Sequence, residues 1–388
     1  MKIIALVIFT VCSLSGCSQG NRTVITGAEQ IDQYLPLIEG LRIAVVANHT
    51  SVVKGTHLVD TLAVLGVEPV RIMKVFVPEH GFRGDFDAGV SVGNEKDPVT
   101  GIPLVSLYGQ HKKPLPEDLE DVDMVIFDIQ DVGVRFFTYI STLHYVMESC
   151  AENEVPLLVL DRPNPNNGYI DGPVLESSQQ SFVGMHRIPV VYGMTIGELA
   201  LMINGEGWLT GGIKCDLRIV PCENYQRGKH YSLPVNPSPN LPNDHSVKLY
   251  PSTCFFEGTV ISEGRGTCMP FEVYGHPLLP GEFSFTPVSI PGMSQHPKLK
   301  DQLCYGKNLR DFIPESGWNR IFLSWLMEAY HQFPEKDKFF LPYFEKLAGT
   351  VNLREQIEAG WDEQAIRESW KPGLDEFKKI RRKYLLYP

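Results

Sequence analysis

Short runs of consecutive apolar residues recur along the first half of the chain, separated by segments with helical or loop-like patterns. These runs, most of them rich in β-branched residues, cover residues 41–47, 70–77, 122–127, 156–160, 217–220 and, more weakly, 103–107. Short uninterrupted apolar runs are typical of strands that are buried on both faces of a sheet. Between them, residues 55–65 and 139–152 have helical patterns. This alternation predicts an α/β domain with a parallel sheet and helices on both faces.

The sequence changes in character near residue 224, where proline and glycine become frequent. Residues 283–290 alternate between apolar and polar, which predicts a strand with one exposed face, and residues 321–330 and 374–384 have helical patterns. We therefore predict two domains, an α/β domain over residues 23–222 and a smaller α+β domain over residues 223–388.

The first 17 residues have the pattern of a bacterial lipoprotein signal peptide. Residues 3–14 are almost wholly apolar, and Leu14-Ser15-Gly16-Cys17 resembles a lipobox, whose cysteine is lipidated and becomes the new N-terminus. The apolar run is too short to span a bilayer, which needs about 20 residues. We therefore expect export and a lipid anchor on Cys17, and the Ser18 that follows favours the outer membrane, facing the periplasm. The alternative is a plain secretory peptide that contains cysteines.

Composition and charge argue against several classes of function. The net charge of −11 argues against a nucleic-acid partner, because phosphate binding needs clustered Lys and Arg. Of the eight cysteines, Cys12 and Cys17 belong to the signal segment, and the other six form no C-x-x-C pair, which argues against a zinc ribbon. The periplasm permits disulfides, and buried free thiols are the alternative. The sequence has no G-x-G-x-x-G motif, P-loop or H-E-x-x-H pair, so we expect no cofactor and no metal.

Polar residues follow most of the predicted strands of the first domain. In open α/β sheets, ligands bind outside the carboxyl ends of the strands. Each polar cluster alone could be a turn or a helix cap, but several at one edge of the sheet predict a polar cleft. The candidates in this domain are Asn48, Glu79, His80, Arg83, Asp128, Gln130, Asp131, Arg135, Tyr139, Asp161, Arg162 and Asn164.

A second group of candidates lies in the later domain. Residues 236–242 form a proline-stiffened polar loop, and residues 250–267 place glutamates and an arginine among glycines, which let a backbone approach a ligand closely. A β-hairpin with charged edges is the alternative interpretation of residues 250–267. The candidates here are Ser238, Asn240, Glu257, Glu263 and Arg265.

Paired carboxylates with amide and hydroxyl donors suit glycoside hydrolysis, in which one carboxylic acid protonates the leaving oxygen and the other acts as base or nucleophile. Glu79 follows a buried strand, and partial burial would raise its pKa, as a general acid requires. The partner carboxylate stays open among Asp128, Asp131, Asp161, Glu257 and Glu263, as does the choice between a retaining and an inverting mechanism. A serine esterase using Ser91 is a weaker alternative, because its G-x-S-x-G match does not lie between a strand and a helix.

Six motifs together resemble those of the DUF1343 family, the NamZ-type exo-β-N-acetylmuramidases. They are Val77-Pro78-Glu79-His80-Gly81-Phe82-Arg83-Gly84 and residues 128–135, 161–165, 193–200, 238–242 and 257–267, and the resemblance spans residues 23–388. It implies removal of terminal β-1,4-linked N-acetylmuramic acid from the non-reducing ends of peptidoglycan fragments, in cell-wall turnover and recycling. It also implies a Rossmann-like domain, a smaller domain and an active site in the cleft between them, with the catalytic glutamate at Glu79.

The substrate that this resemblance implies adds a requirement on the site. Muramic acid differs from N-acetylglucosamine by a lactyl ether that carries a carboxylate, and a selective site should offer it a cation, preferably an arginine. Arg83, Arg135, Arg162 and Arg265 all lie in the motifs, and the alternative for each is an internal salt bridge to Asp85, Asp131 or Asp161. A non-catalytic lipoprotein that binds muropeptides is the main alternative to an enzyme.

Overall fold

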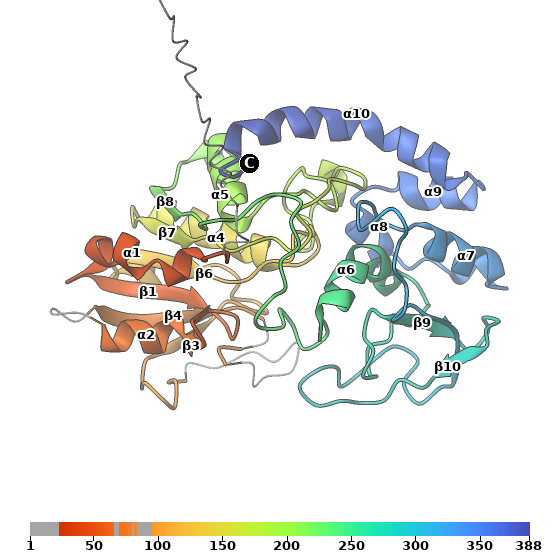
Figure 1. Ribbon diagram of the computed structural model, residues 1–388, viewed down its shortest axis with the longest axis horizontal. Helices are drawn as coiled ribbons and strands as arrows, with labels where there is room; N and C mark the ends of the chain where they lie inside the picture. Colours follow the sequence, from red (N-terminus) through yellow and green to blue (C-terminus); the bar gives the residue numbers. More distant parts are fainter. Residues whose placement is uncertain (1–22, 66–69, 80, 84–94) are drawn as a thin grey trace, which may run out of the picture.

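The computed structural model describes residues 23–65, 70–79, 81–83 and 95–388. Two lobes lie side by side, one built on a sheet and the other mainly on helices, and the long C-terminal helix crosses over both (Figure 1). The predicted lipidation site Cys17 and the candidates His80 and Ser91 lie outside the described residues. None of the described helices is long and apolar enough to cross a membrane.

The first lobe contains a six-stranded parallel sheet in the order β5-β4-β1-β6-β7-β8. Its strands are β5 (Leu104–Ser106), β4 (Arg71–Val77), β1 (Arg42–Ala47), β6 (Met124–Asp128), β7 (Leu157–Leu160) and β8 (Leu217–Val220). All six correspond to the predicted apolar runs. Numbered along the chain, the order is 3-2-1-4-5-6, as in Rossmann folds, and it reverses between β1 and β6, where ligands of such sheets bind.

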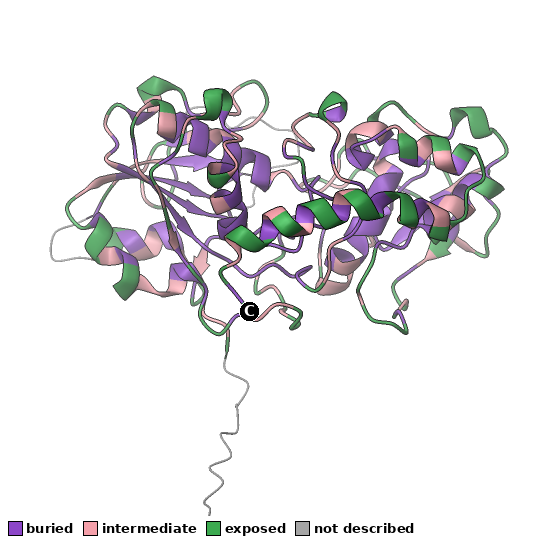
Figure 2. Cartoon of the chain, turned by 90° about the horizontal axis from the view of Figure 1, so that it is seen from above, coloured by how far each residue is buried: buried purple, intermediate pink, exposed green. Residues whose placement is uncertain are grey.

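The central strands of the sheet, β1, β6 and β7, are buried on both faces, which explains their nearly continuous apolar runs. Ile43 and Val45 of β1 pack into one hydrophobic cluster, whereas Ala44 and Val46 pack into the other, because successive side chains of a strand point to opposite faces. Helices α1 (Ile31–Ile38) and α2 (Leu58–Val64) cover the first face, and α4 (Tyr139–Glu152) and α5 (Ile196–Gly205) cover the second. Figure 2 shows the buried strands between these layers.

The helix predicted over residues 55–65 begins later than expected. A short hairpin of β2 (Val52–Val53) and β3 (Thr56–His57) comes first, and Gly55 turns it with a φ of 87°. His57 then caps α2, since its ring accepts a hydrogen bond from the Val59 amide. The first lobe also contains the short helix α3 (Pro116–Leu119) and the 3-10 helices Gly27–Glu29, Ser177–Gln179 and Thr210–Gly212.

The second lobe is the smaller α+β unit that the sequence predicts. Its antiparallel sheet has the order β10-β11-β9, from β9 (Val273–His276), β10 (Phe283–Phe285) and β11 (Cys304–Asn308). Its helices are α6 (Asp244–Thr253), α7 (Ser324–Gln332), α8 (Tyr343–Ala348), α9 (Asn352–Glu358) and α10 (Glu363–Arg381), with 3-10 helices η4 (Cys254–Gly258), Lys336–Lys338 and Arg382–Tyr384. The β-hairpin considered for residues 250–267 is not formed, because α6 continues into η4.

The end of the chain returns to the first lobe after α10 (Figure 1). The Tyr384 hydroxyl donates to Glu206 at 2.6 Å, and the Tyr387 hydroxyl donates to Asp161. The Leu386 amide donates to Glu198 at 2.8 Å. The lobes are therefore joined both by the chain between β8 and α6 and by these C-terminal contacts.

The six cysteines outside the signal segment all lie among the described residues, and none of them forms a disulfide there. Only Cys268 is exposed, and Cys150, Cys215, Cys222, Cys254 and Cys304 are buried. The sequence left disulfides and buried free thiols as alternatives, and the structure has free thiols.

Candidate active site

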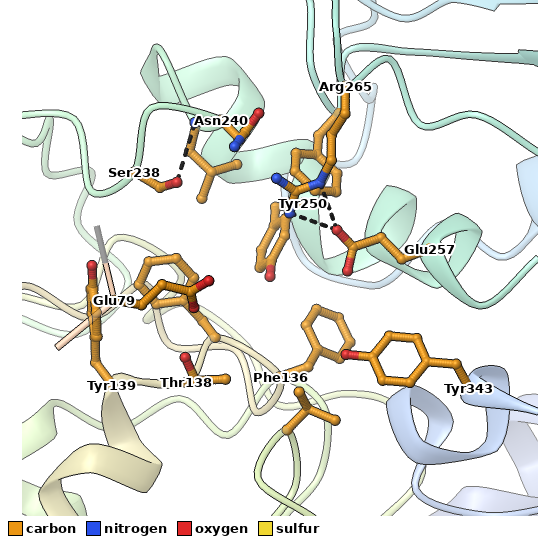
Figure 3. A pocket seen from close by; sticks show the side chains of 14 residues that line it. Glu79, Phe136, Thr138, Tyr139, Ser238, Asn240, Tyr250, Glu257, Arg265 and Tyr343 are labelled. Atoms are coloured by element: carbon orange, nitrogen blue, oxygen red, sulfur yellow. Dashed lines mark hydrogen bonds and ion pairs between the residues drawn. The ribbon is translucent and has the colours of Figure 1, made fainter. Parts of the chain in front are cut away.

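A pocket of about 180 Å³ lies where the two lobes meet. The first lobe contributes Glu79, the segment Phe136–Tyr139 and Val183, and the second lobe contributes Ser238, Asn240, Leu241, Tyr250, Glu257, Arg265, Phe271 and Tyr343. Figure 3 shows the two carboxylates, Glu79 and Glu257, on opposite sides of this pocket and facing one another. The structure therefore brings Glu79, Tyr139, Ser238, Asn240, Glu257 and Arg265 together from the candidates in both halves of the sequence.

Glu79 reaches the pocket from the end of β4. Pro78 follows the strand directly, and the amide of Gly81, whose φ is 80°, donates to the Pro78 carbonyl, so a tight turn holds Glu79. Burial raises the pKa of Glu79 above its usual value, and the nearby charge of Glu257 adds to the rise. A hydrogen bond from the Tyr108 hydroxyl and the charge of Arg265 oppose it. A carboxyl group in these surroundings is suited to hold a proton and donate it.

Glu257 has different surroundings, because it is ion-paired. Both Nε and Nη2 of Arg265 donate to Glu257 Oε1, at 2.8 Å and 2.6 Å. The Arg265 guanidinium stacks over the Phe271 ring at 5.0 Å. This pair supplies a charged carboxylate opposite Glu79. Two carboxyl groups in one pocket, one in surroundings that favour its protonated form and one held by an arginine, suit the paired-carboxylate chemistry of glycoside hydrolysis.

Glu263, a candidate for the second carboxylate, lies beside Arg265 and does not line the pocket. Its side chain is almost wholly buried and pairs with Lys298 at 2.8 Å, while Arg265 Nε is 3.6 Å away. The position of Glu263 indicates that it supports Arg265 and does not contact a ligand.

The rest of the pocket wall is mostly aromatic. The Phe136 ring meets Tyr250 edge-on at 5.4 Å, and Tyr250 meets Phe271 edge-on at 4.8 Å. Such walls with a few polar groups among them are typical of small-molecule sites. On the polar side, the Asn240 amide donates to Ser238 Oγ at 3.2 Å and its side chain donates to the Met293 carbonyl at 2.9 Å, which fixes the proline-rich loop.

The structure does not bring Asp128, Asp131 and Asp161 to the pocket, although the sequence marks all three as candidates. Asp128 is fully buried and pairs with Arg162, at 2.5 Å to Nε and 2.8 Å to Nη2. Asp131 accepts from the Tyr192 hydroxyl and from the Gly133 amide at 2.7 Å, and burial raises its pKa to about 6. All three carboxylates have internal partners.

Asp161 caps α5 instead of facing a ligand. It accepts from the Gly197 amide at 2.8 Å and from Thr195 Oγ1 at 2.7 Å, and burial raises its pKa to about 6. An acidic group at a helix N-terminus satisfies amides that have no partner within the helix. For Asp161, the structure therefore agrees with the helix-cap alternative and not with contact to a ligand.

Amide candidates of the first lobe also have structural partners. Gln130 donates to the carbonyls of Asp131 and Pro163, both at 2.7 Å. Asn164 donates to the Met194 carbonyl at 2.8 Å, and Asn48 accepts from the Thr50 amide at 2.9 Å. These residues shape the loops at the carboxyl edge of the sheet and do not line the pocket.

Among the four candidate arginines, only Arg265 lines the pocket. Arg83 pairs with Asp60 and Asp97, each at 2.8 Å, and Asp85, the partner considered from the sequence, lies outside the described residues. Arg135 is fully buried and donates to the carbonyls of Pro173, Ile188, Leu347 and Ala348, and burial lowers its pKa to about 9. Arg162 is held by Asp128. Three of the four arginines are therefore bound by groups of the protein itself, away from the pocket.

Tyr108 and, apart from Tyr139, the aromatic residues of the pocket wall were not among the candidates taken from the sequence. Tyr108 follows β5, so the same signal that identified the other candidates could have found it. Tyr343, in contrast, lies on the surface of the second lobe at the start of α8, where no pattern distinguishes it from other exposed aromatic residues.

We expect Tyr108→Phe to move the alkaline limb of the kcat/KM–pH profile to higher pH. The hydrogen bond from Tyr108 stabilises the charged form of Glu79, so its loss raises the pKa of Glu79 and keeps the acid protonated to higher pH. The loss of one hydrogen bond should lower kcat by no more than about tenfold. The profile of the exposed-residue control Tyr305→Phe should match the wild type. An unchanged or downward-shifted limb in Tyr108→Phe would contradict this role.

Comparisons with known proteins agree with this architecture. A model of the exo-β-N-acetylmuramidase NamZ N-terminal domain matches residues 43–245, and a model of the NamZ C-terminal domain matches residues 248–387. The peptidoglycan β-N-acetylmuramidase NamZ of Bacillus subtilis (strain 168) is 40% identical over 387 residues, which covers 94% of this chain and 91% of the relative. Two crystal structures of DUF1343 family proteins from Bacteroides fragilis NCTC 9343 each match 94% of this chain and 99% of their own. Their TM-scores are 0.86 and 0.80, at 45% and 30% identity.

Proposed function

We propose a specific reaction for this chain, which belongs to the NamZ family of exo-β-N-acetylmuramidases and is a glycoside hydrolase. The reaction is the release of terminal β-1,4-linked N-acetylmuramic acid from the non-reducing ends of peptidoglycan fragments. The observation that carries this proposal is the pair of carboxylates in one pocket, with Glu79 in surroundings that favour its protonated form and Glu257 held by Arg265 (Figure 3).

In this mechanism Glu79 is the general acid. It donates its proton to the glycosidic oxygen as the bond to the sugar breaks, so the leaving group departs as a neutral alcohol. Burial raises the pKa of Glu79, and the Tyr108 hydroxyl holds the carboxyl group in place. Phe136, Phe137 and Tyr139 line the pocket together with Glu79.

Glu257 is the second carboxylate. It faces the sugar from the opposite side and acts there as the base for an attacking water molecule or as the nucleophile. Arg265 Nη2 donates to one of its oxygens at 2.6 Å, which holds the carboxylate in place for either role.

Product analysis on two disaccharides tests the proposal. We expect release of free N-acetylmuramic acid from a disaccharide with a β-1,4-linked muramic acid at its non-reducing end. The reverse disaccharide, with N-acetylglucosamine at that end, is the matched control and should stay intact. A protein that binds the first disaccharide and releases no monosaccharide would instead be a muropeptide-binding lipoprotein, and cleavage of both disaccharides would contradict the proposed specificity.

A further inference from the structure

The pocket contains a positive charge whose position suits one group of the substrate. Arg265 is the only basic side chain among the described residues that line it. We propose that Arg265 binds the lactyl carboxylate of muramic acid and thereby sets the preference of the enzyme for this sugar over N-acetylglucosamine. This inference rests on the proposed function and adds the residue that selects the substrate.

Elimination of the other cations supports this choice. Arg83, Arg135 and Arg162 are engaged by internal partners away from the pocket. Lys298, the other cation of the Arg265 cluster, donates to the Phe256 carbonyl at 2.6 Å and pairs with Glu263 at 2.8 Å. Since muramic acid carries a carboxylate that N-acetylglucosamine lacks, a selective site needs a cation that can reach the ligand, and in the described pocket wall Arg265 fits that requirement.

The hydrogen-bonding geometry of Arg265 leaves donors available. Its Nε and Nη2 both donate to the same oxygen, Glu257 Oε1, and no described residue accepts a hydrogen bond from Nη1. The side chain is 27% exposed. An arginine has a second edge, formed by Nη1 and Nη2, that can bind a carboxylate through two parallel hydrogen bonds. That edge is the place for the lactyl group.

The guanidinium is also held in position before a ligand arrives. The Phe271 ring lies 5.0 Å from it on one side, and Glu257 and Glu263 lie along its Nε edge. A pre-oriented arginine loses little conformational freedom when it binds a carboxylate, which favours selectivity. The two cations Arg265 and Lys298 balance the two anions Glu257 and Glu263, so recognition depends on the local contact and not on an excess of positive charge.

Three chromogenic substrates and three proteins test the inference. The substrates are the 4-nitrophenyl β-glycosides of N-acetylmuramic acid, of its lactyl methyl ester and of N-acetylglucosamine, and the proteins are the wild type, Arg265→Gln and Arg265→Lys. In the wild type we expect kcat/KM for the free acid to exceed that for the ester by roughly 10- to 100-fold, the effect of a charge-assisted hydrogen-bonded pair. In Arg265→Gln this ratio should fall to near one, and in Arg265→Lys it should be intermediate, since lysine keeps the charge and loses the planar fork.

The ratio of kcat/KM for the free acid to that for the ester distinguishes a loss of carboxylate recognition from a general loss of catalysis. Loss of Arg265 also disturbs Glu257, so all three rates should fall in Arg265→Gln, but only recognition of the carboxylate changes the ratio of acid to ester. An unchanged ratio in Arg265→Gln would overturn the inference while leaving the proposed function intact. A wild type that hydrolyses none of the muramides would overturn the proposed function, and the inference with it.

A binding measurement covers the case in which Arg265→Gln is too slow to assay. In the Glu79→Gln background, calorimetry with free N-acetylmuramic acid and with N-acetylglucosamine compares the two sugars without turnover. Adding Arg265→Gln should weaken muramic acid binding by roughly 10- to 100-fold and leave N-acetylglucosamine binding nearly unchanged. Equal weakening of both sugars would show that Arg265 acts on the fold of the pocket and not on the lactyl group.

Discussion

Glu79→Gln should lower kcat for hydrolysis of a muramic acid–N-acetylglucosamine disaccharide by roughly 10²- to 10⁴-fold, the usual contribution of a general acid. Glutamine keeps the size and the hydrogen-bonding capacity of the side chain but cannot donate the proton that the leaving oxygen needs. Because burial raises the pKa of Glu79, wild-type activity should persist below that pKa and fall as the pH rises through it. The alkaline limb should be absent from the residual activity of Glu79→Gln.

A substrate with a better leaving group distinguishes the roles of the two carboxylates. With a 2,4-dinitrophenyl muramide, whose leaving group needs no proton, Glu79→Gln should lose less than about tenfold, because little general-acid assistance remains to be lost. Glu257→Gln is the matched comparison, and it should lose activity strongly on both substrates, since the base or nucleophile acts on the sugar in either case. Equal losses of Glu79→Gln on both substrates would exclude it as the acid. Circular dichroism of each variant serves as the check on folding.

Asp128→Asn should destabilise the protein by about 3–5 kcal/mol, the cost of breaking a buried ion pair by removing one partner. Asp128 and Arg162 are both buried, and asparagine would leave the guanidinium without its buried counter-charge; the other acceptor of Arg162 among the described residues is the Val52 carbonyl, at 3.1 Å. Since whole domains are stable by about 5–15 kcal/mol, this loss should be evident in chemical denaturation.

A matched control for Asp128→Asn is Glu335→Gln, which breaks an exposed pair with Lys338 and should leave the denaturation midpoint nearly unchanged. A small effect of Asp128→Asn, similar to that of the control, would contradict the structural role of Asp128. Any loss of muramidase activity in Asp128→Asn should follow the loss of folded protein, because the side chain does not line the pocket.

The strands of the first lobe could be predicted well from the sequence. The central strands β1 and β6 are covered on both faces, and burial on both faces explains the apolar runs around Val45 and Ile126. Because the carboxyl ends of parallel strands meet at one edge, the same reasoning placed Glu79 at the ligand-binding edge, where the structure has it. Ser238 and Asn240, which the sequence places in a separate group of candidates, line the same pocket.

The sequence could not separate ligand-facing groups from internal ones at that edge. Asp128, Asp161 and Glu79 all follow strands, but the first pairs with an arginine, the second caps a helix and only the third reaches the pocket. The chemistry that caps a helix and the chemistry that binds a substrate use the same side chains. Whether a carboxylate faces the pocket or binds within the protein depends on partners such as Arg162 and Gly197. These partners are distant in sequence, and the fold of the loops decides which of them comes close.

Because the end of the chain returns to the first lobe, some contacts of that lobe can form only after the whole chain has been synthesised. Synthesis runs from the N-terminus, so the strands of the sheet are complete long before Leu386 and Tyr387 are made. Until these residues arrive, the buried carboxylates of Glu198 and Asp161 lack partners that they have in the finished fold, and each unsatisfied buried group costs about 1–3 kcal/mol. The sheet therefore reaches its full stability last.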